Sequence, residues 1–160
     1  MRVRQHLGKL LVALALPQAA GLIGALSTNP SINTWYSTLV RPEWSPPNWL
    51  FGPVWTLLYL MMGVALFLVW TRHIGGKLRM VWLKLFGIQL ILNSLWSYLF
   101  FGVQRPDYAF YEILVLLGFI VSLIVLALRF DKRAAVLLVP YALWVSFATY
   151  LNYTIWQLNM

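Results

Sequence analysis

Five long apolar runs constrain this chain more than any other feature. They cover residues 7–27, 47–71, 79–101, 107–130 and 133–157, and each has about the 20 residues that a helix needs to cross the hydrocarbon core of a bilayer. Only 10% of the residues are charged, against roughly a quarter in a soluble domain. We therefore predict an all-α fold, with residues 1–160 forming a single integral membrane bundle of five transmembrane helices.

The runs exclude two other fold classes. The strands of a membrane barrel alternate apolar and polar residues over about ten positions, whereas residues 113–128 are almost unbroken Leu, Val and Ile. A soluble helical core is excluded as well, because the chain has too little polar sequence to coat one. Helices also satisfy their own backbone groups in lipid.

The net charge of +8 predicts an orientation rather than binding to nucleic acid, because the basic residues lie at span ends and not along one stripe. Ten lie on one side of the membrane: Arg2, Arg4, Lys9, Arg72, Lys77, Arg79, Lys84, Arg129, Lys132 and Arg133. Arg41 and Arg105 lie on the other. We expect the N-terminus inside and the C-terminus outside, in a bacterial or an organellar membrane.

The first apolar run allows two readings. Its basic start and small residues fit a transmembrane helix or a cleaved signal peptide ending within residues 1–26. Its small pairs Ala20/Gly24 and Gly21/Ala25 allow a close helix contact, either inside the monomer or in a homodimer.

Residues 28–46 form the one long connector and contain Trp35, Tyr36 and Trp44. So many aromatic residues predict an ordered segment rather than a disordered one, and long ordered loops in compact bundles commonly cover a site. Pro46 and Pro47 suit the first turn of the next helix and attach the loop to it. We expect this loop to act as a lid.

Aromatic and amide side chains recur at helical spacing on three spans. Trp55 lies about 12 Å below the outer end of its span, and Tyr59 lies one turn deeper on the same face. Asn93 reaches a similar depth, with Trp96 beside it. Trp144 and Ala148 share a stripe on the last span. The pattern predicts an apolar pocket under the loop, although amides that link helices and rings that fill a core would give the same spacing.

Catalytic and metal-binding patterns are scarce. The chain has no cysteine, and its four acids are Glu43, Asp107, Glu112 and Asp131. Asp107 and Glu112 begin a span, where the helix dipole favours anions. His6 and His73 lie at a terminus and in a turn, too far away to bind haem in the pocket. We therefore expect no metal site and no obligatory cofactor.

The loop and three of the spans carry motifs of one family. The motifs are Trp35-Tyr36, Arg41-Pro42, Trp44, Pro46-Pro47, Trp49, Gly52-Pro53-Val54-Trp55, Leu58-Tyr59, Gln89-Leu90, Leu92-Asn93, Trp96, Phe100-Phe101-Gly102, Pro140-Tyr141, Leu143-Trp144, Phe147-Ala148-Thr149 and Leu151-Asn152-Tyr153. The chain resembles the tryptophan-rich sensory protein or translocator protein family, formerly called peripheral benzodiazepine receptors.

The resemblance implies a dimeric membrane protein that binds porphyrins and synthetic isoquinoline or benzodiazepine ligands beneath the first loop. Carried over by motif, the ligand-binding residues are Trp35, Trp55, Tyr59, Asn93, Trp96, Trp144 and Ala148. The family's cholesterol motif needs a basic residue that is missing here, because Leu151 and Tyr153 are followed by Gln157. We do not expect sterol recognition.

Three functions follow as hypotheses. The first is a receptor or transport-type protein for porphyrins, with a sensory or regulatory role. The second, implied by the resemblance, is light- and oxygen-dependent breakdown of porphyrin with Trp55 and Trp144 as redox-active rings. The third is a packing or assembly protein without a ligand.

Overall fold

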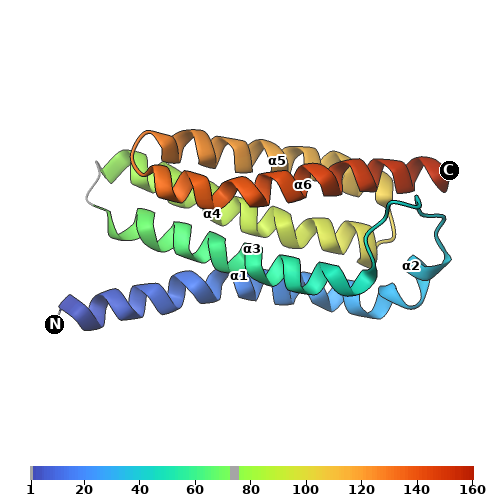
Figure 1. The fold of residues 1–160 in the computed structure, drawn as a ribbon, viewed down its shortest axis with the longest axis horizontal. Coiled ribbons are helices and arrows are strands. Elements are labelled where there is room, and N and C mark those ends of the chain that lie inside the picture. The colour runs from blue at the N-terminus through green and yellow to red at the C-terminus, as the bar shows by residue number, and fades with distance from the viewer. Residues whose placement is uncertain (1, 73–75) are drawn as a thin grey trace.

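The protein is a bundle of long helices, as a computed structural model shows (Figure 1). The structure describes residues 2–72 and 76–160, with side chains from residue 6 onward. The elements are α1 Arg2–Ile32, α2 Trp35–Thr38, α3 Asn48–Thr71, α4 Gly76–Ser97, the π-helix η1 Tyr98–Gly102, α5 Pro106–Leu128 and α6 Lys132–Leu158. Among the described residues, five helices are long and apolar enough to cross a membrane. The predicted all-α bundle is confirmed.

The helices pack side by side in a closed ring. α1 lies against α3 and α4, α3 also lies against α6, and α5 joins α4 to α6. The two ends of the chain lie at opposite ends of the bundle (Figure 1). The bundle therefore has two distinct ends. One end carries the N-terminus and the α5–α6 connection, and the other carries α2 and the C-terminus.

α1 is longer than the sequence predicted, because it continues through residues 28–32. Three of these five residues, Thr28, Asn29 and Ser31, are polar, so hydropathy alone ends the span at residue 27. The helix continues because polar groups find partners there: Ser31 Oγ donates to the Phe101 carbonyl oxygen at 2.8 Å, and Thr28 Oγ1 donates to the Gly24 carbonyl oxygen at 3.1 Å. The connector thus begins after Ile32 and includes the short helix α2.

Small residues of α1 make close contacts within the chain. Ser94 Oγ of α4 donates to the Ala20 carbonyl oxygen at 2.9 Å, and a Cβ on Gly24 would lie 2.9 Å from Ser97 Oγ. On α3, a Cβ on Gly63 would lie 2.8 Å from the Ala13 carbonyl oxygen. Of the two uses that the sequence allowed for Ala20 and Gly24, packing inside the monomer is the one seen here.

The end of α4 widens into the π-helix η1 before the chain turns into α5. Such local π-helices are frequent at functional sites. η1 buries Phe100 to 2% exposure and is followed by Gln104, whose φ of 59° lies in the left-handed region that ends helices. Pro106 then occupies the first turn of α5, where its missing N–H leaves no bond unmade.

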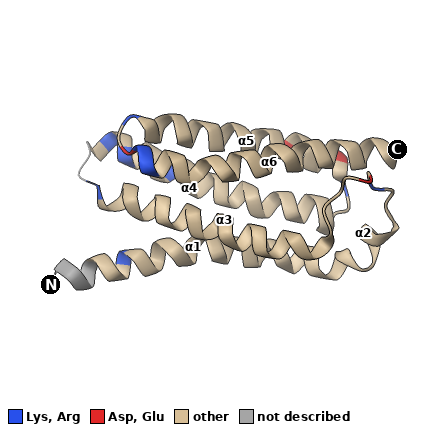
Figure 2. Cartoon of the chain, viewed as in Figure 1, with Lys and Arg blue, Asp and Glu red and all other residues tan. Residues whose placement is uncertain are grey.

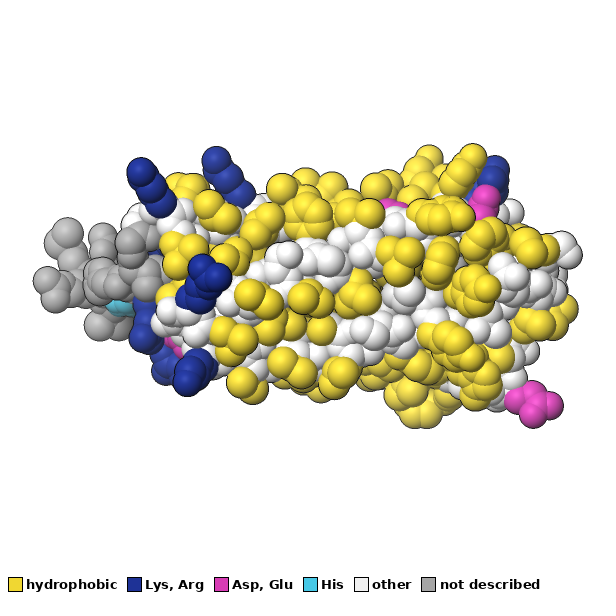
Figure 3. Space-filling view, turned by 90° about the horizontal axis from the view of Figure 1, so that it is seen from above, with side chains coloured by type: hydrophobic (Ala, Val, Ile, Leu, Met, Phe, Trp, Pro, Cys, Tyr) yellow, Lys and Arg dark blue, Asp and Glu magenta, His cyan; other side chains and the backbone are white. Residues whose placement is uncertain are grey.

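Charged residues gather towards the two ends of the bundle (Figures 2 and 3), and Glu112, buried within α5, is the exception among the described residues. Most basic residues lie at the end with the N-terminus, as the count of basic residues at the span ends predicted. There Asp131 is bonded to Arg72 at 3.2 Å and to Arg133 at 3.1 Å. The hydrogen bond from Arg133 is the main reason that the pKa of Asp131 is lowered. The side chains of Arg2 and Arg4 lie outside the described residues.

Candidate ligand-binding cavity

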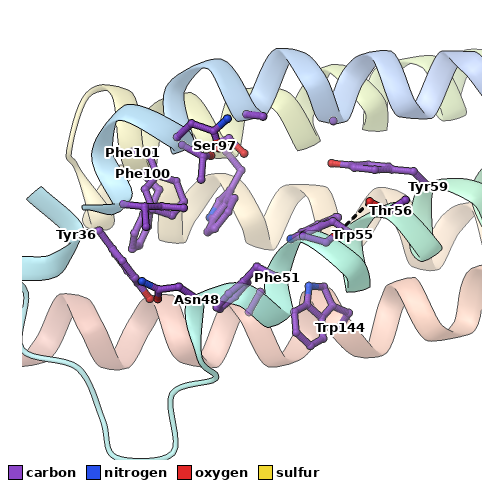
Figure 4. A pocket seen from close by; sticks show the side chains of 18 of the residues that line it. Tyr36, Asn48, Phe51, Trp55, Thr56, Tyr59, Ser97, Phe100, Phe101 and Trp144 are labelled. Atoms are coloured by element: carbon purple, nitrogen blue, oxygen red, sulfur yellow. Dashed lines mark hydrogen bonds between the residues drawn. The ribbon is translucent and has the colours of Figure 1, made fainter. Parts of the chain in front are cut away.

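A cavity of about 480 Å³ opens in the half of the bundle that carries α2. Its volume lies within the roughly 300–1,000 Å³ of small-molecule sites. α1, α3, α4 with η1, and α6 all contribute to its wall (Figure 4). The lining residues that carry the argument below are Gln18, Gly21, Tyr36, Phe51, Trp55, Tyr59, Trp96, Phe100, Trp144, Ala148 and Asn152.

Aromatic rings form most of this wall and lie against one another. The Trp55 ring stacks on Tyr59, with their centroids 5.4 Å apart. The Trp144 ring meets Phe51 edge to face at 5.9 Å. Trp96 stacks on Phe100 at 5.3 Å. Rings held in this way by neighbouring rings present fixed flat faces to the cavity.

Five of the seven predicted ligand-binding residues line this cavity: Trp55, Tyr59, Trp96, Trp144 and Ala148. They come from three helices, α3, α4 and α6, as their helical spacing indicated. Figure 4 shows Trp55, Tyr59 and Trp144 around one hollow. The shared cavity is a matter of geometry; ligand binding by these residues stays a prediction.

Asn93 does not line the cavity, contrary to the expectation. It lies behind Tyr59, whose hydroxyl donates to Asn93 Oδ1 at 2.6 Å. Asn93 Nδ2 donates to the Tyr141 hydroxyl at 3.1 Å, which donates to Gln89 Oε1 at 2.9 Å. The amide therefore links α3, α4 and α6, which is the bridging alternative that the spacing left open.

Trp35 also lies outside the lining and contacts the site indirectly. Its ring packs edge to face on Phe100 at 5.7 Å. Its neighbour Tyr36 lines the cavity instead, is 5% exposed and lies under the Arg41 guanidinium at 5.0 Å from the ring centre. The short helix α2 turns consecutive side chains in different directions, and sequence alone did not specify which one faces inward.

The connector is attached to α6 at two points. Trp44 stacks on Tyr150 with centroids 5.1 Å apart. Val40 N–H donates to Asn159 Oδ1 at 3.0 Å, and Asn159 Nδ2 donates back to the Val40 carbonyl oxygen at 2.9 Å. The connector is therefore an ordered cover over this end of the bundle, as its aromatic content predicted; its action as a lid stays a prediction.

The polar groups of the wall differ in how well they are bonded. Trp96 Nε1 donates to Asn152 Oδ1 at 3.0 Å, and Asn152 Nδ2 donates to the Pro106 carbonyl oxygen at 2.7 Å. Trp144 Nε1 is buried and has no partner. A buried donor without a partner is costly, so this N–H is a group that an acceptor on a ligand would satisfy.

α1 supplies a wall that sequence reasoning missed. Gln18 Nε2 donates to the Thr56 carbonyl oxygen at 3.2 Å and ties α1 to α3. One turn further, Gly21 faces the Tyr59 ring so closely that a Cβ would overlap the ring. The small-residue spacing of α1 was a signal of close packing, but small residues give no sign of the ring that they accommodate.

The cavity rim between α1 and α3 faces the surroundings of the bundle. Leu22 of α1 is 70% exposed and Trp49 of α3 is 71% exposed, and both belong to the lining. Such large exposed apolar side chains on a membrane helix face lipid. The cavity therefore borders the bilayer on this side.

Acidic, basic and histidine side chains of the described residues lie away from the cavity lining. Asp107 is paired with Arg105 at the start of α5, and Glu112 lies buried on α5 outside the lining. His6 is on the first turns of α1, and His73 lies outside the described residues. Within residues 2–72 and 76–160, no group of three His, Cys, Asp or Glu side chains is placed to hold a metal ion.

Comparison with known proteins identifies relatives over nearly the whole chain. Residues 13–157 match the sequence model of the TspO/MBR family. Tryptophan-rich protein TspO of Chlorobaculum tepidum is 46% identical over 154 residues, covering 94% of this chain and 95% of that protein. Translocator protein of Bos taurus is 37% identical over 90% of this chain and 86% of its own length. The tryptophan-rich sensory protein of Cereibacter sphaeroides is 35% identical over 78% of this chain and 77% of its own length.

Proposed function

The chain belongs to the TspO/MBR family, and on that premise we propose that it binds porphyrins and related flat hydrophobic ligands in its intramembrane cavity. The match to the family model and to its members confirms the predicted family. The chain is an integral multi-pass membrane protein. The names of its relatives, tryptophan-rich sensory protein and translocator protein, support a sensory or receptor role. Porphyrin is the ligand class that we add to this role.

The aromatic wall is the observation that carries the proposal. Flat rings from α3, η1 and α6 surround one hollow, and stacking favours another flat, apolar molecule between them. The unpartnered Trp144 Nε1 adds a single fixed donor. Porphyrins combine a large flat ring with peripheral carboxylates, which are acceptors for such an N–H group.

The exposed rim supports entry from the membrane. A hydrophobic ligand partitions into lipid, and Leu22 and Trp49 border the cavity on the lipid-facing side. The opposite, aqueous route is covered by the connector with Tyr36 and Trp44. We propose that the ligand enters between α1 and α3. Its binding then serves a sensory or regulatory role or is one step in its transport.

Tryptophan quenching by protoporphyrin IX tests the proposal in lipid nanodiscs. We expect saturable quenching in the wild type. Trp144→Phe should lower the affinity for protoporphyrin IX, because phenylalanine keeps an aromatic face but removes the N–H donor. Trp156→Phe is the matched control, since Trp156 packs on Phe110 and Tyr111 outside the lining. Equal affinity in the wild type and in Trp144→Phe would contradict the assigned donor, and absence of saturable quenching would contradict the ligand class.

A second candidate function is light- and oxygen-dependent porphyrin breakdown. It is favoured by the position of Trp55 and Trp144, two oxidisable rings that line the same cavity. Illumination with excess porphyrin separates catalysis from simple ligand binding: an enzyme continues beyond one equivalent and slows in Trp55→Phe and Trp144→Phe. Loss of one equivalent only, or the same loss in both variants, argues for binding without catalysis.

We also propose a homodimer with each N-terminus inside. α1 leaves large apolar side chains exposed, including Leu11, Leu16 and Ile23, and either lipid or a second copy would cover them. Sedimentation in detergent distinguishes a dimer from a monomer. Labelling of a single cysteine introduced at Glu43 from the outside of sealed vesicles tests the orientation.

A further inference from the structure

Glu112 is a buried acid that the ligand cavity does not use. It lies on α5 within the membrane span, its side chain is 9% exposed, and neither carboxyl oxygen has a hydrogen-bond partner. Ionisable residues inside a membrane span are costly to bury and commonly mark functional sites. This carboxyl group therefore needs a reason to be there.

One hydrogen bond between α4 and α5 gives the level of Glu112 relative to α4, and a second one joins α5 to α6. Trp82 Nε1 of α4 donates to the Leu123 carbonyl oxygen of α5 at 3.0 Å, and the two helices run antiparallel (Figure 1). Glu112 precedes Leu123 by as many residues as Asn93 follows Trp82, so Glu112 and Asn93 lie at one level. At the other end, Asn152 Nδ2 of α6 bonds the Pro106 carbonyl oxygen of α5.

Gln89 supplies a second unsatisfied group near this level. Its side chain is fully buried, its Oε1 accepts from the Tyr141 hydroxyl, and its Nε2 has no partner. Gln89 precedes Asn93 by one helical turn, an offset of about 5–6 Å along the axis. Gln89 Nε2 and the Glu112 carboxyl oxygens are not bonded to each other, and two unsatisfied groups near one level suit one bridging water, which needs two or more polar partners.

No cation faces Glu112 from the helices packed around it in the described residues. α3 has no charged residue, and its titratable group near this level is Tyr59. On α6 the charged residues Lys132 and Arg133 lie at the far end, and the group at this level is Tyr141. On α4 the nearest cation, Lys84, is exposed and more than two turns away from Asn93.

Arg105, the cation that precedes Glu112 in the chain, already has an acidic partner. It pairs with Asp107 at the start of α5. A carboxylate without a cation is far more costly to bury than a neutral carboxyl group. The geometry therefore favours the neutral acid, which keeps an O–H donor that must be satisfied.

The hydrogen bonds from the cavity to Gln89 all point the same way. Tyr59 donates to Asn93, Asn93 donates to Tyr141, and Tyr141 donates to Gln89. Bonds in such a chain polarise one another. The chain of hydrogen bonds begins at the Tyr59 hydroxyl in the cavity wall and ends at Gln89, whose Nε2 is a donor without a partner.

We propose that Glu112 and Gln89 form a second, membrane-embedded polar site between α4, α5 and α6, which binds a water molecule against a neutral carboxyl group. Through Tyr141, Asn93 and Tyr59 this site is coupled to the ligand cavity. A ligand that displaces the Tyr59 hydroxyl changes the bonding of the Glu112 carboxyl group. The coupling rests on the proposed function, whereas the polar site itself does not.

Infrared spectroscopy of the protein in nanodiscs tests the site without any ligand. Of the four acids, Asp107 and Asp131 are ion-paired, Glu43 is exposed, and Glu112 is the one that is both buried and unpaired. We expect one carbonyl stretch of a protonated carboxylic acid, lost in Glu112→Gln, which keeps the shape of the side chain. A spectrum without that band, or an unchanged band in Glu112→Gln, overturns the proposal.

Isotope exchange tests the bridging water. In H₂¹⁸O we expect a sharp O–H stretch of the wild-type protein to shift, as a bound water requires, and Gln89→Leu to lack it. A wild-type spectrum without an isotope-shifted O–H band overturns the bound water.

Ligand-difference spectra test the coupling. When protoporphyrin IX is added and tryptophan quenching shows it bound, we expect the Glu112 band to shift in the wild type. Tyr141→Phe removes one link outside the cavity lining, so we expect it to retain quenching and lose the band shift. Tyr111→Phe, an exposed tyrosine of α5, is the matched control and should retain both.

The outcomes separate the two proposals. If protoporphyrin binds and the Glu112 band stays unchanged, the coupling is wrong while the proposed function stands. If nothing binds, the proposed function is wrong, and the ligand-free spectra still decide the polar site. A band shift that persists in Tyr141→Phe also contradicts the coupling chain.

Discussion

Two tryptophans, one from each half of the bundle, have opposite surroundings. In the half with the N-terminus, Trp82 is fully buried, stacks on Phe86 at 5.1 Å and donates to the Leu123 carbonyl oxygen. In the half with α2, Trp144 borders a cavity and its N–H has no partner. A tryptophan with every contact satisfied stabilises a fold, whereas one with an unsatisfied face and donor is available to a ligand.

The same contrast appears in the glycines of the α1–α3 contact. A Cβ on Gly63 would press on the backbone of Ala13 and Leu14, which cannot move without separating the helices. A Cβ on Gly21 would press on the Tyr59 ring, which borders empty space. One half of the bundle is thus packed without room to adjust, and the other has room.

The largest expected effect is the loss of stability in Trp82→Ala. Truncating a fully buried large aromatic residue costs about 3–5 kcal/mol, and this change also leaves the Leu123 carbonyl without its side-chain donor. Trp144→Ala should cost clearly less, because one face of its ring already borders a cavity. Unfolding in mixed micelles with increasing denaturing detergent measures both; equal losses would contradict the contrast between the halves.

The next effect in size is that of alanine at the two glycines. Gly63→Ala should destabilise the protein by about 1–3 kcal/mol, as overpacking of a rigid contact does. Gly21→Ala should cost less, because the Tyr59 ring moves into the cavity, and should instead weaken protoporphyrin quenching. Gly118→Ala is the control, since a Cβ there meets no atom within 4 Å; a Gly63→Ala protein as stable as this control would show that the contact is loose.

A smaller, pH-dependent effect is expected at Asp131. It accepts from the Arg133 N–H at the start of α6 at 3.0 Å, and loss of such a helix cap costs about 0.5–2 kcal/mol. Because the pKa of Asp131 is lowered by folding, this stabilisation is complete above the ordinary aspartate pKa near 4 and is lost as the pH falls through the folded value. Asp131→Asn should reduce that acid-dependent loss; an identical pH profile in the variant would contradict the role.

The smallest effect is expected at the connector, because Trp44 is 44% exposed. Trp44→Ala removes a stacked contact with Tyr150 and an edge-to-face contact with Phe147, each worth about 0.5 kcal/mol beyond its buried area at the low end of the range for aromatic pairs, so the fold should persist. Because the proposed route lies between α1 and α3, at the rim formed by Leu22 and Trp49, protoporphyrin should dissociate from this variant at the wild-type rate. Stopped-flow recovery of tryptophan fluorescence measures the rate, and faster dissociation would contradict that route and support a connector that opens as a lid.

The sequence was sufficient for the architecture because bilayer thickness allows little freedom. Runs of apolar residues had to become spanning helices, and the four-residue spacing of Trp55 with Tyr59 and of Trp144 with Ala148 placed them on inward faces. The end of α1 at Ile32 was not predictable from hydropathy, since it depends on Ser31 reaching a carbonyl oxygen at Phe101, distant in the chain.

The site was predictable as far as helical spacing reaches and no further. Spacing placed Asn93 on an inward face, but such a face borders both the cavity and the neighbouring helices. In the structure the Tyr59 hydroxyl donates to Asn93 Oδ1, so the amide links helices and does not line the cavity. Likewise, Trp35 and Tyr36 are adjacent in sequence and both pack on Phe100, and only the course of the short helix α2 turns Tyr36 into the cavity lining. The wall from Gln18 and Gly21 could not be predicted, because one isolated amide and one small residue do not indicate a cavity lined by rings.

The most direct measurement of the central claim follows the indole N–H signals of Trp82 and Trp144 by nuclear magnetic resonance, in protein labelled with ¹⁵N at tryptophan. Assignment uses Trp82→Phe and Trp144→Phe. As protoporphyrin IX is added, we predict that the Trp144 signal moves, because its free N–H gains an acceptor, while the Trp82 signal stays in place. A Trp144 signal that does not respond to bound porphyrin, or equal movement of both signals, would contradict the account.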